Sequence, residues 1–184
     1  MNVKNNIDYY KLFDSLEYFK SNNFKYVDLD WIVDEYVSNI TKPSDRKNFY
    51  INDKVLVASA EQSFLELIIN NKLEYGRYCG ITPCFRDEIV DYLHNNFFMK
   101  VELIDTMNTT IKSLNEIIDI CLNNFNKYLP CEILQIDDIT FDIIDSKNKI
   151  ELGSYGIRMY NNFSWIYATG LAEPRLTNVI KLLK

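Results

Sequence analysis

The chain contains no apolar run that approaches the length of a membrane-spanning helix, no internal repeat, and no proline-, glycine- and serine-rich linker. Its N-terminus, MNVKNNIDYY, lacks the basic-then-apolar order of a secretion signal. A hydrophobic share of 47% beside 25% charged residues is typical of a globular domain. We therefore expect a cytosolic protein with a single domain over residues 1–184, long enough to bury a substantial core.

Typical zinc ligands are also scarce, and acidic residues outnumber basic ones, 26 to 20. His94 is the only histidine, and the cysteines form no CxxC pair, so the sequence does not support a zinc site. Because no secretion signal is present, we expect no disulfide framework but reduced thiols in or near the core, at Cys79, Cys84, Cys121 and Cys131. The net charge of −6 opposes a broad nucleic-acid-binding surface, although it is compatible with a local basic pocket.

The hydrophobic pattern predicts an α+β fold, in which helices flank an antiparallel β-sheet. A last helix should begin near Pro174, and helical spacing of apolar residues predicts three more, over residues 7–20, 61–70 and 111–129. The remaining apolar segments predict strands, within residues 22–33, at Phe85–Glu88, and over residues 97–104, 133–144, 149–160 and 163–169. Short polar turns between consecutive strands favour antiparallel pairing.

The segment PCFRDEIVDYLHNNFFMKVELI carries the most informative residues. If Arg86 and Glu88 lie on a strand, they point to the same face, and the segment that follows His94 returns beside them as a hairpin. A guanidinium suits a phosphate, a carboxylate suits an amine, and an aromatic ring such as that of Phe98 can stack on a base. The alternative is an ordinary β-hairpin with a surface Arg–Glu pair.

With Glu102 four residues after Phe98, this register resembles motif 2 of class II aminoacyl-tRNA synthetases, and is most similar to the aspartyl, asparaginyl and lysyl enzymes. The resemblance implies that Arg86 holds the α-phosphate of ATP and that Glu88 faces the adenine. It also implies that Phe98 stacks on the adenine, that His94 reaches the outer phosphates, and that Glu102 belongs to the amino acid site.

The downstream segment resembles the last strands of the same catalytic core. Asp142 and Glu151, on the two arms of a hairpin, would hold the Mg²⁺ that bridges the ATP phosphates. The resemblance places Arg158 against the side chain of the bound amino acid, which implies aspartate or asparagine in preference to lysine. The alternative for Arg158 is an exposed arginine on a strand.

The sequence GLAEPRL is similar to motif 3, in which Gly170 would let ATP approach the backbone and Arg175, opening the last helix, would bind the γ-phosphate. The sequence departs from that motif at two positions, since Ala172 replaces the second glycine and Pro174 precedes the arginine.

The segment VASAEQSFLELI is similar to the part of the family that receives the α-ammonium of the amino acid. Glu61 would pair with that cation, and Gln62 or Ser59 would assist. Ser59 can equally be the N-cap of the following helix, and the two roles are compatible. Motif 1 matches least, because Asp30 stands where the family has a proline.

The resemblance implies ATP-dependent activation of an amino acid as an aminoacyl adenylate, by a catalytic core without an anticodon-binding domain. The acyl acceptor stays open among a tRNA end, a protein amine and a small amine such as ammonia. Family architecture implies a homodimer, formed through the first strand and its preceding helix, where Tyr26, Leu29, Trp31 and Val33 offer apolar area. The alternatives are a non-catalytic paralogue with a regulatory or binding role and an accessory dimerisation subunit.

Overall fold

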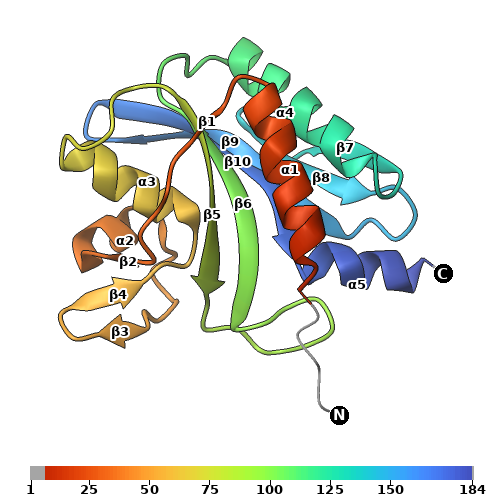
Figure 1. The fold of residues 1–184 in the computed structure, drawn as a ribbon, viewed down its shortest axis with the longest axis horizontal. Coiled ribbons are helices and arrows are strands. Elements are labelled where there is room, and N and C mark those ends of the chain that lie inside the picture. The colour runs from red at the N-terminus through yellow and green to blue at the C-terminus, as the bar shows by residue number, and fades with distance from the viewer. Residues whose placement is uncertain (1–6, 184) are drawn as a thin grey trace.

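The computed structural model describes residues 7–183, which form one large sheet, one small sheet and the helices around them (Figure 1). The helices within this range are α1 (Tyr9–Ser21), α2 (Glu35–Thr41), α3 (Ala60–Ile69), α4 (Ile111–Phe125) and α5 (Arg175–Leu182). The strands are β1 (Lys25–Tyr26), β2 (Ile32–Val33), β3 (Tyr50–Ile51), β4 (Lys54–Leu56), β5 (Arg77–Phe85), β6 (Phe97–Asp105), β7 (Cys131–Gln135), β8 (Thr140–Asp145), β9 (Glu151–Tyr160) and β10 (Phe163–Glu173).

The large sheet has seven strands in the order β1-β5-β6-β10-β9-β8-β7. Every neighbouring pair is antiparallel except β1 and β5, which pair in parallel over two residues. Strands β2, β4 and β3 form the small antiparallel sheet. The predicted α+β class, with helices flanking a mainly antiparallel sheet, is confirmed.

The central strand β10 separates two hydrophobic cores, because successive side chains of a strand point to opposite faces. Ile166 and Ala168 point into the larger core, which the sheet shares with α1, α4 and α5. Trp165 points the other way, into a core shared with α2 and α3. Figure 1 shows α1 and α4 over one part of the sheet and α3 with the small sheet on the other side of β5.

Three of the four predicted helices, α1, α3 and α4, begin at side chains that cap them. Asp8 accepts a hydrogen bond from the amide of Lys11 at the start of α1, and Ser59 accepts one from the amide of Glu61 at the start of α3. The third predicted helix, α4, ends at Phe125, four residues before the predicted end. The chain then tightens into turns, and the side chain of Asn126 accepts a hydrogen bond from the amide of Cys131.

Three of the predicted strands are wrong: residues 22–33 and 133–144 each form two strands, and most of the strand predicted at Phe85–Glu88 is a loop. Residues 22–33 form two short strands in different sheets, because between them Leu29 packs against Gly80 instead of continuing the ladder beside β5. Residues 133–144 form two strands joined by a turn, in which Asp137 accepts a hydrogen bond from the amide of Ile139. Helix α2 and the small sheet were not predicted.

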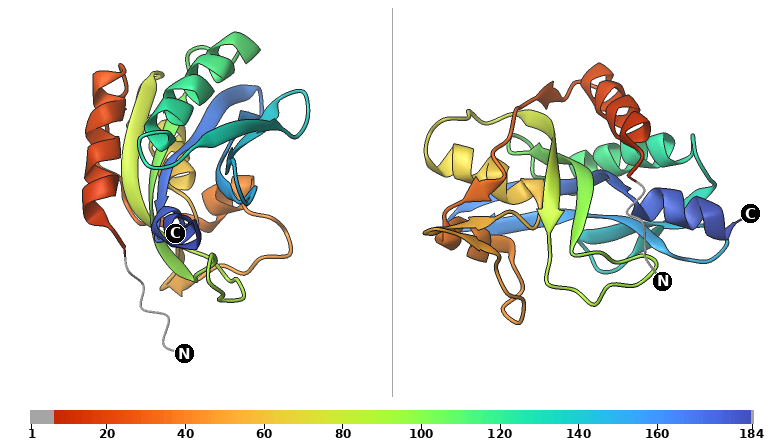
Figure 2. Two further views of the ribbon diagram at one scale, coloured as in Figure 1. Left: turned by 90° about the vertical axis from the view of Figure 1, so that its right-hand side faces the viewer. Right: turned by 60° about the horizontal axis from the view of Figure 1, so that its bottom comes forward.

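Strands β5 and β6 do form a hairpin, but the first strand runs over Arg77–Phe85 instead of the predicted Phe85–Glu88, so Arg86 and Glu88 lie in the loop that follows it. This loop extends beyond the sheet toward α5 (Figure 2), where Asn178 donates a hydrogen bond to the carbonyl of Tyr92. The cysteines match their prediction, since all four are free thiols and only Cys131 is partly exposed. No helix in the described range is long and apolar enough to cross a membrane.

Candidate active site

Two adjoining cavities open on the face of the sheet opposite α1 and α4. They share the side chains of Arg86, Glu88, Lys100, Glu151 and Thr169, so together they form one cleft with two compartments. The first compartment has a volume of about 50 Å³ and the second about 390 Å³. The second is therefore within the usual range for a ligand site, whereas the first would have to widen to admit a nucleotide.

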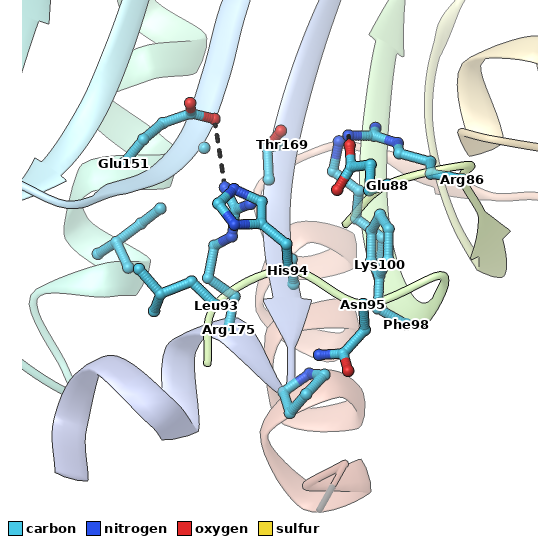
Figure 3. A pocket seen from close by; sticks show the side chains of 14 residues that line it. Arg86, Glu88, Leu93, His94, Asn95, Phe98, Lys100, Glu151, Thr169 and Arg175 are labelled. Carbon is cyan, nitrogen blue, oxygen red and sulfur yellow. Dashed lines mark ion pairs between the residues drawn. The ribbon is translucent and has the colours of Figure 1, made fainter. Parts of the chain in front are cut away.

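The first compartment collects the residues predicted to bind ATP, apart from Gly170, and Figure 3 shows how they converge: Arg86, Glu88, His94, Phe98 and Arg175. The guanidinium of Arg86 lies 5.1 Å from the centre of the Phe98 ring, and its Nε donates to the carbonyl of Ala58 at 3.0 Å. A second nitrogen of Arg86 lies 4.0 Å from Glu88. Three contacts thus hold this cation at the border between the compartments.

The loop between β5 and β6 covers the first compartment. His94 lines the cavity, and its Nδ1 lies 2.9 Å from the carboxylate of Asp91. Hydrogen bonds from the His94 side chain and from the Leu93 and His94 amides lower the pKa of Asp91 to about 2. Asn96 donates to the carbonyls of both Arg86 and Glu88, which ties the two ends of the loop together.

Arg175 is the first residue of α5, and its side chain lines the first compartment. One guanidinium nitrogen of Arg175 lies 3.7 Å from the carboxylate of Glu151. Gly170 does not line either compartment. A β-carbon at Gly170 would lie 2.6 Å from the ring of Phe19, on the opposite face of the sheet. Within the segment GLAEPRL, the small residue that does border the cavity is Ala172, at the position where the family motif has a glycine.

The second compartment collects the residues predicted to bind the amino acid, namely Ser59, Glu61, Gln62, Glu102 and Arg158. The buried carboxylate of Glu61 lies 2.6 Å from Arg158 and accepts a hydrogen bond from the indole of Trp165, also at 2.6 Å. Burial raises the pKa of Glu61, against the opposing effects of Arg158 and Trp165. Glu61 and Arg158 therefore neutralise each other as an ion pair within this compartment.

A second ion pair forms the wall between the compartments. The buried carboxylate of Glu102 accepts hydrogen bonds from Lys100 at 2.7 Å, from Ser59 at 2.8 Å and from the amide of Ala60. Burial opposes ionisation of Glu102, but Lys100 and Ser59 outweigh it and hold its pKa below the ordinary value. Ser59 thus acts both as helix cap and as a contact within the site, whereas Gln62 binds the backbone of Ala58 and Ser38.

Lys100 is a charged residue of the cleft that was not predicted from the sequence. It lies between Phe98 and Glu102 on the same strand, and its nearly buried ammonium borders both compartments. The sequence of β6 did indicate where Lys100 points, because side chains alternate between the two faces of a strand and residues 98, 100 and 102 therefore point to the same face of the sheet. A lysine between two predicted site residues therefore had to point toward the site as well.

Asp142 and Glu151 lie on neighbouring strands, as predicted, but only Glu151 borders the cleft. Burial raises the pKa of Asp142, and the negative charge of Glu151 raises it further. Two carboxylates with this mutual repulsion suit a divalent cation, which would relieve it. No group of three or more histidine, cysteine or acidic side chains in residues 7–183 forms a ready metal site.

No protein-family model and no curated protein sequence matches the chain. Solved structures do match it. Pyrrolysyl-tRNA synthetase from Desulfitobacterium hafniense aligns with 98% of this chain and 71% of its own length, at 15% identity and a TM-score of 0.73. Seryl-tRNA synthetase from Pyrococcus horikoshii, complexed with ATP, aligns with 93% of this chain and 49% of its own, at 14% identity and a TM-score of 0.70.

Cytoplasmic serine-tRNA ligase from Naegleria fowleri, in complex with AMP, aligns with 92% of this chain and 52% of its own length, at 16% identity and a TM-score of 0.66. The chain thus spans about half the length of the seryl enzymes it matches. At these identities the likeness shows the fold, which is that of class II aminoacyl-tRNA synthetase catalytic domains.

Proposed function

We propose that this protein activates an amino acid with ATP, forming an enzyme-bound aminoacyl adenylate and releasing pyrophosphate. The observation that carries the proposal is the two-compartment cleft, in which Arg86 and Lys100 border both cavities. In such a cleft the carboxylate of an amino acid in one compartment can meet the α-phosphate of a nucleotide in the other.

In the reaction, a carboxylate oxygen of the amino acid attacks the α-phosphorus of ATP, and the bond from that phosphorus to the bridging oxygen of pyrophosphate breaks. Arg86 and Lys100 would stabilise negative charge where the two substrates meet, and Arg175 would hold the departing phosphates. Phe98 would stack on the adenine, and Glu88 would face its amine. No protein nucleophile is required.

Glu151, which borders the cleft, would hold Mg²⁺ in this site, and Asp142 on the neighbouring strand would add its negative charge. The ion would neutralise phosphate charge when bound. The carboxylate of Glu151 lies 3.7 Å from the guanidinium of Arg175. Phosphates that bind Arg175 would separate this pair, and the carboxylate of Glu151 would then be free to bind a cation.

The α-ammonium of the amino acid would lie among the carboxylates of Glu61 and Glu102, with Ser59 close by. A tRNA end, a protein amine and a small amine are all chemically competent acceptors, since each can attack an acyl adenylate. We also propose a cytosolic homodimer, but not through the whole predicted surface. Leu29 and Val33 are buried in the cores of their own chain, which leaves Tyr26 and Trp31 exposed there.

The decisive experiment measures amino-acid-dependent exchange of pyrophosphate into ATP, with each of the twenty amino acids, because exchange reports activation whatever the acceptor. Arg175→Ala should lower the exchange rate about 10²–10³-fold, the usual effect of removing one preorganised charge contact. Lys181→Ala, an exposed cation on the same helix, is the matched control and should leave exchange unchanged. Absence of both exchange and ATP binding by calorimetry at millimolar nucleotide would refute the proposal.

A second candidate is a non-catalytic relative that binds ligands without activating them. The observation that favours it is internal neutralisation, since Arg158, Lys100 and Arg175 each already face a carboxylate of the same chain. ATP binding without exchange for any amino acid would favour this candidate.

A further inference from the structure

A third cavity, of about 330 Å³, lies at the end of the sheet beyond the candidate active site, between α2, α3 and the turn that joins β9 to β10. None of its lining side chains is charged, in contrast to both compartments of the cleft. They are Tyr36, Ile40, Leu65, Ile68, Ile69, Tyr75, Tyr160, Asn161, Phe163 and Trp165.

Three of these rings form a stack that leads from solvent into the protein. Tyr75 stacks on Phe163 with ring centres 5.6 Å apart, and Phe163 stacks on Trp165 at 5.4 Å, with interplanar angles of 23° and 19°. Tyr75 is 64% exposed, whereas Trp165 is 1% exposed. The adjacent turn has two asparagines, Asn161 and Asn162, at φ values of 49° and 62°, which suit a tight two-residue hairpin. The wall of the cavity is therefore well defined.

We infer that this cavity binds a small, uncharged, planar aromatic molecule. Its volume lies within the range of small-molecule sites. A charged ligand would lose its hydration without finding an opposite charge, since the lining offers only apolar groups, phenol hydroxyls and the amide of Asn161. A flat ring suits the cavity because Tyr75, Phe163 and Trp165 line it with near-parallel aromatic rings, against which another aromatic ring can pack.

The cavity shares one side chain with the network of the active site. Trp165 borders the cavity, and its indole nitrogen donates to Glu61, which in turn holds Arg158. A ligand that shifts this indole would alter the position of the carboxylate in the amino acid compartment. The inference goes beyond the proposed function, and binding to the cavity can be tested without ATP or an amino acid.

The test uses Trp31→Phe, which leaves Trp165 as the sole tryptophan of the chain. The probe is 4-nitroanisole, an uncharged nitroaromatic whose absorption overlaps indole emission, so that once bound it quenches Trp165 by short-range energy transfer although that ring is 1% exposed. We expect saturable quenching. Adding Tyr75→Ala should weaken the apparent affinity roughly fivefold, the effect of losing one aromatic pair. Tyr10→Ala, at a tyrosine that is 91% exposed on α1, is the matched control and should not change it.

A second variant, Ile69→Lys, places a charge at a partly exposed edge of the cavity and should abolish saturable quenching while circular dichroism stays unchanged. The inference is overturned if quenching rises linearly with probe and is equal in all variants. It is also overturned if sedimentation shows an association of the chain that Tyr75→Ala removes, because the cavity would then belong to an interface between copies.

Discussion

Replacing Trp165 by phenylalanine tests the network that connects the sheet to the amino acid compartment. Trp165 is 1% exposed, and its indole nitrogen donates to the buried carboxylate of Glu61 at 2.6 Å. A hydrogen bond to a charged group contributes about 1.5–3 kcal/mol to stability. The smaller phenyl ring also leaves unfilled space, which adds about 1 kcal/mol. The free energy of unfolding should therefore fall by about 2.5–4 kcal/mol.

The assay is urea denaturation followed by far-ultraviolet circular dichroism, which does not depend on tryptophan fluorescence. Trp31→Phe, at a site that is 55% exposed, is the control and should change stability by less than about 0.5 kcal/mol. A double-mutant cycle with Glu61→Gln separates the hydrogen bond from the packing. We expect a coupling of about 1 kcal/mol, the difference between a charged and a neutral acceptor.

The reasoning fails if Trp165→Phe costs no more than Trp31→Phe. It also fails if the effects of Trp165→Phe and Glu61→Gln are additive, because the indole and the carboxylate would then not interact in solution. Additivity together with a large single-site loss would assign the whole effect of Trp165 to packing.

Three further predictions concern charge. Lys100→Met should lower pyrophosphate exchange about 10²–10³-fold, whereas Lys54→Met, a cation 44% exposed on β4, should not; equal rates would remove Lys100 from the site. Arg158→Ala leaves Glu61 without its cation, so the ranking of amino acids in exchange should move from asparagine toward lysine, and an unchanged ranking would make Arg158 structural. Burial raises the pKa of Glu173 from 4.5 to about 7, so the folded chain retains a proton that the unfolded chain loses, and stability should fall as pH rises through that window. Glu173→Gln should remove this fall, giving a variant more stable than the wild type at pH 7 but not at pH 4.5, by urea denaturation.

The sequence was sufficient for the fold class and for the faces of the main strands, because alternation along β6 and β10 depends only on local geometry. Phe98 and Glu102 point to one face, as alternation along β6 requires, and Ser59 is the helix cap that the sequence offered as one of its roles. The short strands, by contrast, could not be predicted. Residues 22–33 read as one apolar strand, and only the packing of Leu29 on Gly80 explains the interruption.

The sequence also could not predict which site residues pair with each other. Glu61 and Arg158 are 97 positions apart, and both were predicted to contact the substrate, but nothing in the sequence indicates that they lie 2.6 Å from each other. Gly170 is the opposite case, because it was predicted to contact a ligand but does not line the cleft. Its place in a motif suggested contact with a ligand, whereas the residue is small because Phe19 packs against it from the other face of the sheet. Motif spacing predicts which residues lie in the cleft, but not which of them form ion pairs or hydrogen bonds with each other.

The strand β10 contains an irregularity between Thr169 and Leu171, where Gly170 is an extra residue in its pairing with β6. The carbonyls displaced there are bound by buried side chains: Tyr155 donates to Thr169, and Asn124 on α4 donates to Gly170. The bulge thereby sets where Thr169 and the residues after it meet the cleft. Helix α4, on the opposite face of the sheet from the cleft, therefore influences the shape of the cleft. A substitution at Asn124 would move the part of β10 that lines the cleft without changing any residue that touches a ligand.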